Sequence, residues 1–253
     1  NLVSCVTSSK QFSKYEESWK ESKVKSMKQS LYGDVNQESF DYYIRTRQAC
    51  NMVYENDKFR SVQSNAENQL VIQEMKQMEY SLMKEAGVLQ YDKGLKMVSP
   101  KFYEIMKRIE DYVNADGIPT GKILYYSEFR SDAGSEIFEQ VLLSNGYQKY
   151  DGSTETKGKR YTFITGSEDE IERKRNKEAF NDVSNKLGDQ IQIMIISGAG
   201  AEGISLTCVR QVHIMEPYWN YVRIDQVFGR AIRLGSHLDL PPKERTVEQY
   251  MYL

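Results

Sequence analysis

Four polar residues near the carboxyl end of the sequence have the spacing of one helix face. They are Arg223, Gln226, Arg230 and Arg233. Apolar residues lie between them, so the pattern predicts an amphipathic helix from about Val222 to Leu234 with a guanidinium stripe facing outward. Such a stripe is commonly a solvated face, but guanidinium forks beside a glutamine also suit an oxyanion such as a transferring phosphoryl group. Gly229 favours the second interpretation, because glycine within a helix costs about 1 kcal/mol relative to alanine.

A glycine-rich segment, Ser197 to Leu206, directly follows the most apolar run of the chain, at 191–196. Three glycines and two alanines leave its backbone N–H groups accessible to an anion. A simple strand-to-helix turn would have the same composition. Its place at the carboxyl end of a predicted strand favours a ligand, because open α/β sheets bind ligands at that edge.

The elements that would position these residues alternate between strand and helix. Strands are expected over 123–126, 160–164, 191–196 and 212–215, with a further strand pattern at 245–253. Helices are expected over 100–113, 136–143, 168–180 and 222–234. This alternation predicts an α/β fold over residues 97–253, with a mostly parallel sheet and helices on both faces.

Residues 1–96 are polar and lack strand-like alternation. We expect a mainly helical N-terminal segment or insertion, with one helix over 66–86 that ends at Gly87. Residues 10–28 carry six lysines against three glutamates. They are either a solvated, partly mobile segment or a basic arm near nucleic acid.

Composition indicates a globular protein without a metal site or a disulfide framework. The net charge is −2, so binding of a polyanion would depend on a local basic surface. Three widely spaced cysteines, without a CxxC pair, fit a reducing intracellular compartment. No apolar run approaches the roughly 20 residues that span a bilayer. His213 lies in an apolar run and is expected to be a packed core histidine.

Four segments resemble the second RecA-like lobe of superfamily 2 helicases. Residues 123–129 resemble motif IV, 165–181 the segment before motif V, 197–206 motif V and 226–235 motif VI, in the order and spacing of that family. Residues 212–225 resemble Swi/Snf-type remodellers and, more closely, helicases of large cytoplasmic DNA viruses. That group includes the poxvirus nucleoside triphosphatase I, the poxvirus early transcription factor small subunit and their asfarvirus counterparts. Residues 42–51 also have the character of the viral group.

The resemblance implies a role for individual residues. Arg230 and Arg233 would be arginine fingers that reach the γ-phosphate of ATP, and Gln226 would help to place the phosphate or the attacking water. Contacts to the nucleotide are implied for Gly203, Glu202, Ser205 and Gly229. Contacts to the nucleic-acid backbone are implied for Ser127, Gly166, Ser167 and Ser197. Position 205 departs from the aspartate of many family members.

The sequence has no GxxxxGK[ST] loop and no acidic magnesium site after an apolar strand. The resemblance therefore implies that the main site for ATP and Mg²⁺ lies on a preceding RecA-like lobe. The Gly-Lys pair at 121–122 is interpreted as a turn before a strand. We expect the sequence to be part of a longer polypeptide and to be inactive by itself.

Basic residues flank the Gly166–Ser167 turn, and they predict a sequence-independent contact to the nucleic-acid backbone. They lie at 157–160 and 173–177. The acidic residues at 168–172 would cancel much of that field, so a solvated charged helix is the alternative.

Two functions fit the resemblance. One is the motor lobe of an ATP-dependent helicase or translocase in viral transcription. The other is a docking module of an initiation or termination factor that does not separate strands. An unrelated α/β domain that binds a phosphorylated ligand is a third reading. The implied partners are DNA or RNA, the protein's own first lobe and a viral RNA polymerase or transcription factor, without a membrane. The implied location is the host cytoplasm, in viral factories, and the virion.

Overall fold

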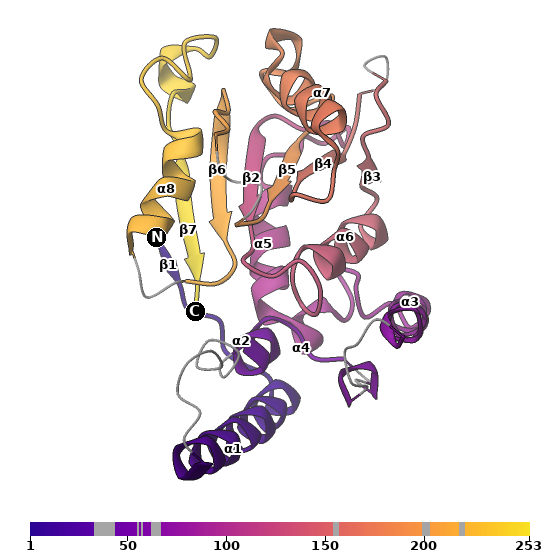
Figure 1. Ribbon diagram of the computed structural model, residues 1–253. Coiled ribbons are helices and arrows are strands. Elements are labelled where there is room, and N and C mark those ends of the chain that lie inside the picture. The colour runs from indigo at the N-terminus through magenta and orange to yellow at the C-terminus, as the bar shows by residue number, and fades with distance from the viewer. Residues whose placement is uncertain are drawn as a thin grey trace. The chain divides into compact units, whose positions relative to one another are not determined.

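All neighbouring strands of the sheet are parallel (Figure 1). In order across the sheet they are β1 (Leu2–Val3), β7 (Glu248–Tyr252), β6 (Val209–Ile214), β2 (Lys122–Tyr126), β5 (Ile193–Ile196), β4 (Arg160–Ile164) and β3 (Gln148–Lys149). The computed structural model describes residues 1–32, 44–54, 56, 58–61, 67–153, 157–198, 203–217 and 221–253. Because the strands are parallel, the segments that follow β2, β4, β5 and β6 meet at one edge of the sheet.

The central strands are buried throughout, which matches strands covered on both faces. Every residue of β2, β4 and β5 is buried, and β6 is buried except for the partly exposed Arg210. These strands are rich in isoleucine, valine and aromatic residues, which suit a pleated surface. The four strands predicted from the sequence are confirmed.

Helices cover both faces of the sheet, as predicted. They are α5 (Pro100–Glu110), α6 (Ser135–Ser144), α7 (Glu170–Asn181) and α8 (Tyr221–Ala231), with 3₁₀ turns η3 (Val183–Asn185) and η4 (Pro242–Glu244). Tyr125 stacks on Phe138 of α6 with ring centroids 4.0 Å apart. The adjacent Leu124 belongs to the core that contains Phe180 of α7 and Ile224 of α8. Since successive strand residues face opposite sides, α6 covers one face and α7 and α8 cover the other.

Several boundaries differ from those expected. Helix α5 ends at Glu110 rather than near 113, because Val113 pairs with Pro119 in an isolated bridge. The Gly-Lys at 121–122 does precede a strand, β2. The short strands β1 and β3 were not predicted. Residues 245–253 do contain a strand, β7, which pairs with both β6 and β1.

The chain divides into two compact units, residues 1–5 with 104–253 and residues 6–103. The division therefore falls within α5, and the first five residues group with the sheet, whereas the sequence suggested a boundary at 96. None of the helices in the described part of the chain has the length and apolar character that crossing a bilayer requires.

The smaller unit is mainly helical, as expected. Its elements are α1 (Ser9–Tyr32), α2 (Ile44–Asn51), η2 (Lys58–Ser61), α3 (Gln69–Glu85), α4 (Leu95–Val98) and the first turn of α5. The Gln11 side chain joins α1 to α2 by donating to the carbonyls of Ala49 and Cys50. Helix α3 is followed by Gly87 at φ +70°, which confirms the predicted helix and its end. Residues 42–43 of the viral-like segment lie outside the described residues.

Candidate functional site

Helix α8 presents its predicted polar stripe away from the core. Ile224, Val227 and Ala231 are buried, while Gln226 is exposed. The helix ends at Ala231, so Arg233 lies just beyond it rather than within it. The chain turns at this point, where Gly235 has a φ of +82°. The Ser236 hydroxyl stabilises the turn by donating to the Arg233 carbonyl at 2.8 Å. The predicted apolar side is confirmed as far as Ala231, whereas Leu234 lies beyond the helix and is exposed.

Arg230 is half-buried in the last turn of α8. Its backbone carbonyl accepts a hydrogen bond of 2.9 Å from Leu206 N, which joins the helix to the end of the glycine-rich segment. Its guanidinium Nε is shielded from solvent and has no hydrogen-bond partner among the described residues. A buried N–H without a partner is costly, by about 1–3 kcal/mol, and so requires an explanation.

Arg233 is exposed and bridges the same two segments. Its guanidinium donates to the Ser205 hydroxyl, and its Nε donates to the Gly229 carbonyl at 3.0 Å. A Cβ at Gly229 would meet no atom within 4 Å. Among the described residues, therefore, no other part of the chain packs closely against Gly229. Ser205, Arg230 and Arg233 do lie together.

The glycine-rich segment is described only at its two ends. Ser197 and Gly198 follow β5. Gly203, two residues before Ser205 in the sequence, is exposed and has a φ of +71°. The predicted nucleotide contact Glu202 lies outside the described residues. The segment therefore starts at the carboxyl edge of the sheet and ends beside the last turn of α8.

Two of the predicted nucleic-acid contacts have hydroxyls engaged inside the protein. Ser127 is fully buried, and its Oγ lies 2.9 Å from both Glu216 Oε1 and the Phe129 carbonyl. The Ser197 Oγ donates to the Thr165 carbonyl at 2.7 Å. These hydroxyls bind strand ends to one another, which sequence spacing alone could not show.

The other two predicted contacts, Gly166 and Ser167, are exposed after β4. Their donors converge on the carboxylate of Glu168. It accepts from Thr165 N at 2.6 Å, Gly166 N at 3.2 Å, and the hydroxyls of Thr165 and Ser167 at 2.9 Å. Partial burial opposes ionisation of Glu168, but these hydrogen bonds outweigh it and lower its pKa below the usual value. A carboxylate thus sits where the resemblance places a phosphate.

A separate cluster of polar side chains lies at the first turn of α8. Arg223 Nη2 lies 2.9 Å from Glu128 Oε1, and the other carboxylate oxygen of Glu128 accepts from the Tyr126 hydroxyl at 2.8 Å. Burial and the neighbouring Glu128 raise the pKa of Tyr126, so it stays a neutral donor. The backbone N–H of Glu128 donates to buried Glu216 at 2.8 Å. Arg223 is therefore held by an ion pair and is not part of an open stripe.

Comparison with known proteins agrees with this geometry. The sequence profile of the helicase conserved C-terminal domain matches residues 104–235, more than half of the chain. The chain belongs to the helicase conserved C-terminal domain family. The match begins at Glu104, where the longer of the two segments of the larger unit begins.

The relatives include proteins of large DNA viruses. A protein of Acanthamoeba polyphaga mimivirus, provisionally named an ATP-dependent RNA helicase, is 30% identical over 90% of this chain and 36% of its own length. A termination factor NPH-I homologue of African swine fever virus is 34% identical over 61% of this chain and 26% of its own length. The chain thus spans about a third of these relatives or less. The predicted resemblance to superfamily 2 helicases of large DNA viruses is confirmed.

Solved structures establish the fold as RecA-like. The C-terminal part of the Fun30 ATPase domain has a TM-score of 0.60 at 17% identity, covering all of this chain and 84% of that one. The Sulfolobus solfataricus SWI2/SNF2 ATPase core, solved with double-stranded DNA, has a TM-score of 0.53 at 13% identity, covering all of this chain and 40% of that one. The RecA-like fold, which was expected from the four helicase-like segments, is therefore confirmed.

The three basic residues at 157–160, which were proposed to flank the Gly166–Ser167 turn, are paired or buried. Lys157 pairs with Asp189 and Lys159 with Glu110, both at 2.7 Å. Arg160 is buried, and it donates to the carbonyls of Gln190 and Ser153. The 157–160 cluster is therefore not an open cationic patch.

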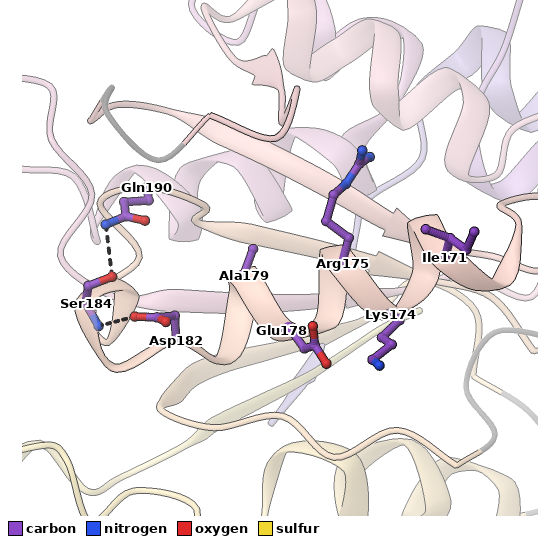
Figure 2. Close-up of a pocket in the computed structure, with 8 residues that line it drawn as sticks. All are labelled: Ile171, Lys174, Arg175, Glu178, Ala179, Asp182, Ser184 and Gln190. Carbon is purple, nitrogen blue, oxygen red and sulfur yellow. Dashed lines mark hydrogen bonds between the residues drawn. The ribbon is translucent and has the colours of Figure 1, made fainter.

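Cations on α7 are more accessible. A surface groove of about 700 Å³ is lined by Lys174, Arg175 and Glu178 of this helix and by Ser184 and Gln190 beyond its end (Figure 2). Two acidic side chains, Glu178 and Asp182, line the groove together with the two basic ones, so it lacks the uniform charge of an anion site. Among the described residues, no group of three or more His, Cys, Asp or Glu side chains gathers as a metal site.

Proposed function

We propose that this chain is the second motor lobe of an ATP-dependent superfamily 2 helicase or translocase. In this role it presents Arg230 and Arg233 to ATP and Mg²⁺ bound mainly by another lobe of the complete protein. The observation that carries the proposal is the Nε of Arg230, a shielded donor without a partner among the described residues, beside Arg233 and Ser205.

The residues at the end of α8 fit a nucleoside triphosphate. Arginine supplies only donors and stays charged, so its chemistry matches phosphate oxygens. ATP with Mg²⁺ supplies the phosphoryl group that is transferred. Arg230 and Arg233 would stabilise the negative charge that develops on it, and the exposed Gln226 would orient a water or a phosphate oxygen. Ser205 and Gly229 both accept hydrogen bonds from Arg233. They would contact the nucleotide, together with Gly203 and Glu202.

We further propose that the carboxyl edge of the sheet contacts the nucleic-acid backbone. Gly166 and Ser167 are exposed there, and the cations of α7 follow them in sequence. Ser127 and Ser197 would shape this edge, because their hydroxyls already hold neighbouring strand ends together. The contact would be independent of base sequence, since backbone phosphates carry no sequence information.

A second candidate is a docking module of a viral transcription factor that hydrolyses ATP without separating strands. The name of the African swine fever virus relative, a termination factor homologue, supports it. A viral RNA polymerase or transcription factor subunit would then be a partner, in the host cytoplasm or the virion. A strand-separation assay on the complete protein distinguishes the two candidates, because only the first predicts ATP-dependent unwinding or translocation.

The decisive experiment is ATP turnover by the complete protein carrying Arg230→Ala or Arg233→Ala. Each substitution should lower turnover by about 10³-fold, as for other arginine fingers. ATP binding should change little, because most binding contacts lie on the other lobe. Lys243→Ala is the control, since Lys243 is an exposed cation in η4, outside α8. Turnover at the wild-type rate in both arginine variants would make the stripe structural.

A further inference from the structure

One ion pair in the lobe has no part in the proposed nucleotide or phosphate contacts. Arg223, in the first turn of α8, lies 2.9 Å from Glu128, which directly follows Ser127 at the end of β2. The two residues are 95 positions apart in the sequence. Their side chains are 37% and 24% exposed. The pair therefore joins the amino end of α8 to the edge of the sheet.

Glu128 is held on two further sides. Its second carboxylate oxygen accepts from the Tyr126 hydroxyl at 2.8 Å, and its backbone N–H donates to Glu216 at 2.8 Å. Glu216 is itself 3% exposed and contacts Ser127. These contacts hold the Glu128 carboxylate, with which Arg223 forms its ion pair, in one position.

Arg223 also touches the beginning of the glycine-rich segment. A Cβ at Gly198 would lie 2.7 Å from Arg223 Nη2, closer than side-chain carbons approach a neighbour. The guanidinium therefore packs on the backbone of Gly198, immediately after Ser197. Through one side chain, α8 contacts the segments that follow β2 and β5 at the carboxyl edge.

The same helix carries Arg230 seven residues later. At 1.5 Å per residue, the two arginines lie about 10 Å apart along one α-helix, which moves as a unit over such a length. A shift of the edge segments would thus reach Arg230 through the Arg223 contact.

We propose that Arg223 and Glu128 form a positioning pair that makes ATP turnover at Arg230 depend on nucleic acid bound at the sheet edge. This inference rests on the proposed function. Neither residue touches ATP or the nucleic acid. A partly exposed pair of this kind contributes little to folding, so its loss should leave the protein folded.

The test compares ATP turnover of the complete protein with and without saturating single-stranded or double-stranded DNA. Arg223→Ala and Glu128→Ala should each lower the ratio of stimulated to basal turnover by about tenfold, within the usual range of coupling between sites. The basal rate, the KM for ATP and the thermal midpoint should stay close to wild type. The double variant should be no worse than either single variant, because the residues act through each other.

Two further variants distinguish a positioning role of the Arg223–Glu128 pair from a purely structural one. Gly198→Ala should reproduce the loss of stimulation, because its methyl group displaces the end of the Arg223 side chain. Arg223→Lys keeps the charge but not the planar fork, and should restore part of the ratio. Asp225→Asn is the control, since this exposed carboxylate lies on the same helix.

The proposal is overturned if Arg223→Ala retains the wild-type ratio, if it lowers both rates and the thermal midpoint together, or if the wild-type protein is not stimulated by nucleic acid. Arg230→Ala, measured in parallel, tests the proposed function separately. If Arg230→Ala abolishes turnover while Arg223→Ala keeps the ratio, the motor assignment stands and only the positioning pair fails. If Arg230→Ala and Arg233→Ala both retain wild-type turnover, the proposed function itself fails.

Discussion

Replacing Glu168 by glutamine should tighten the binding of nucleic acid to this chain. The Glu168 carboxylate occupies the backbone N–H groups of Thr165 and Gly166 and the Ser167 hydroxyl. A backbone phosphate that uses Gly166 and Ser167 must displace this carboxylate or share the donors with it. Because hydrogen bonds hold the pKa of Glu168 below its usual value, the group stays ionised throughout the neutral range.

The size of the effect follows from the position of the carboxylate. Two like charges about 4 Å apart repel by about 1 kcal/mol in bulk water and about 4 kcal/mol at an effective dielectric constant of 20. Glu168 is only partly buried, so the lower part of this range applies. A gain of about 1–2 kcal/mol corresponds to binding that is about 5- to 30-fold tighter. One additional phosphate contact should also steepen the salt dependence by about 0.7–0.9 in log–log slope.

Fluorescence anisotropy of a labelled oligonucleotide, titrated at several salt concentrations, measures both quantities. Glu170→Gln is the matched control, because this exposed residue in the first turn of α7 gives the same change in charge. Equally tighter oligonucleotide binding in both variants would mean that only the overall electrostatic field of the protein had changed. Weaker binding of Glu168→Gln would refute the reasoning outright, since Glu168 would then be organising the turn for its ligand.

Three further results are expected. Changing Arg173, Lys174 and Lys177 of α7 together to glutamine should weaken oligonucleotide binding and flatten its salt slope, whereas an unchanged slope would direct attention to the lysines at 10–28. Burial lowers the pKa of Lys122 to about 8, so unfolding free energy should rise between pH 8 and 10 in wild type, and Lys122→Met should remove this rise in urea titrations. Burial also lowers the pKa of His213 to about 3, so the unfolded chain binds the extra proton below pH 6.5. Between pH 7 and 5 the wild type should lose about 2 kcal/mol more than His213→Gln, and equal losses would contradict the burial argument.

The sequence predicted the fold where apolar residues form an uninterrupted or periodic run. The strand at 160–164 matches β4 residue for residue, and the strands at 123–126 and 191–196 differ from β2 and β5 by one or two residues. The strands β1 and β3 have two residues each, too few for any periodicity to appear. They are defined only by their neighbours, since Leu2 pairs with Met251 across nearly the whole chain.

The candidate site was predictable as a set of positions but not as a set of contacts. The spacing of motifs places Ser127 and Ser197 directly after strands, as observed, whereas Arg233 lies beyond the end of α8 rather than within the predicted helix. It cannot show that Ser127 is buried against Glu216, 89 residues away, or that Lys159 pairs with Glu110, 49 residues away. Such pairings depend on tertiary packing. His213 was assigned to the core correctly, and it is fully buried with its Nδ1 2.7 Å from the Tyr252 hydroxyl.

The two ends of α8 differ in how their polar groups are satisfied. At the amino end, Arg223 has a partner within the lobe, Glu128. At the carboxyl end, the shielded Nε of Arg230 lacks a partner among the described residues. An unmet donor costs stability, and an acceptor such as a phosphate oxygen would recover that cost. A helix anchored at one end and unsatisfied at the other suits a lobe whose nucleotide is bound by a neighbouring lobe. Closing the two lobes on ATP would then be favoured by the Arg230 donor itself.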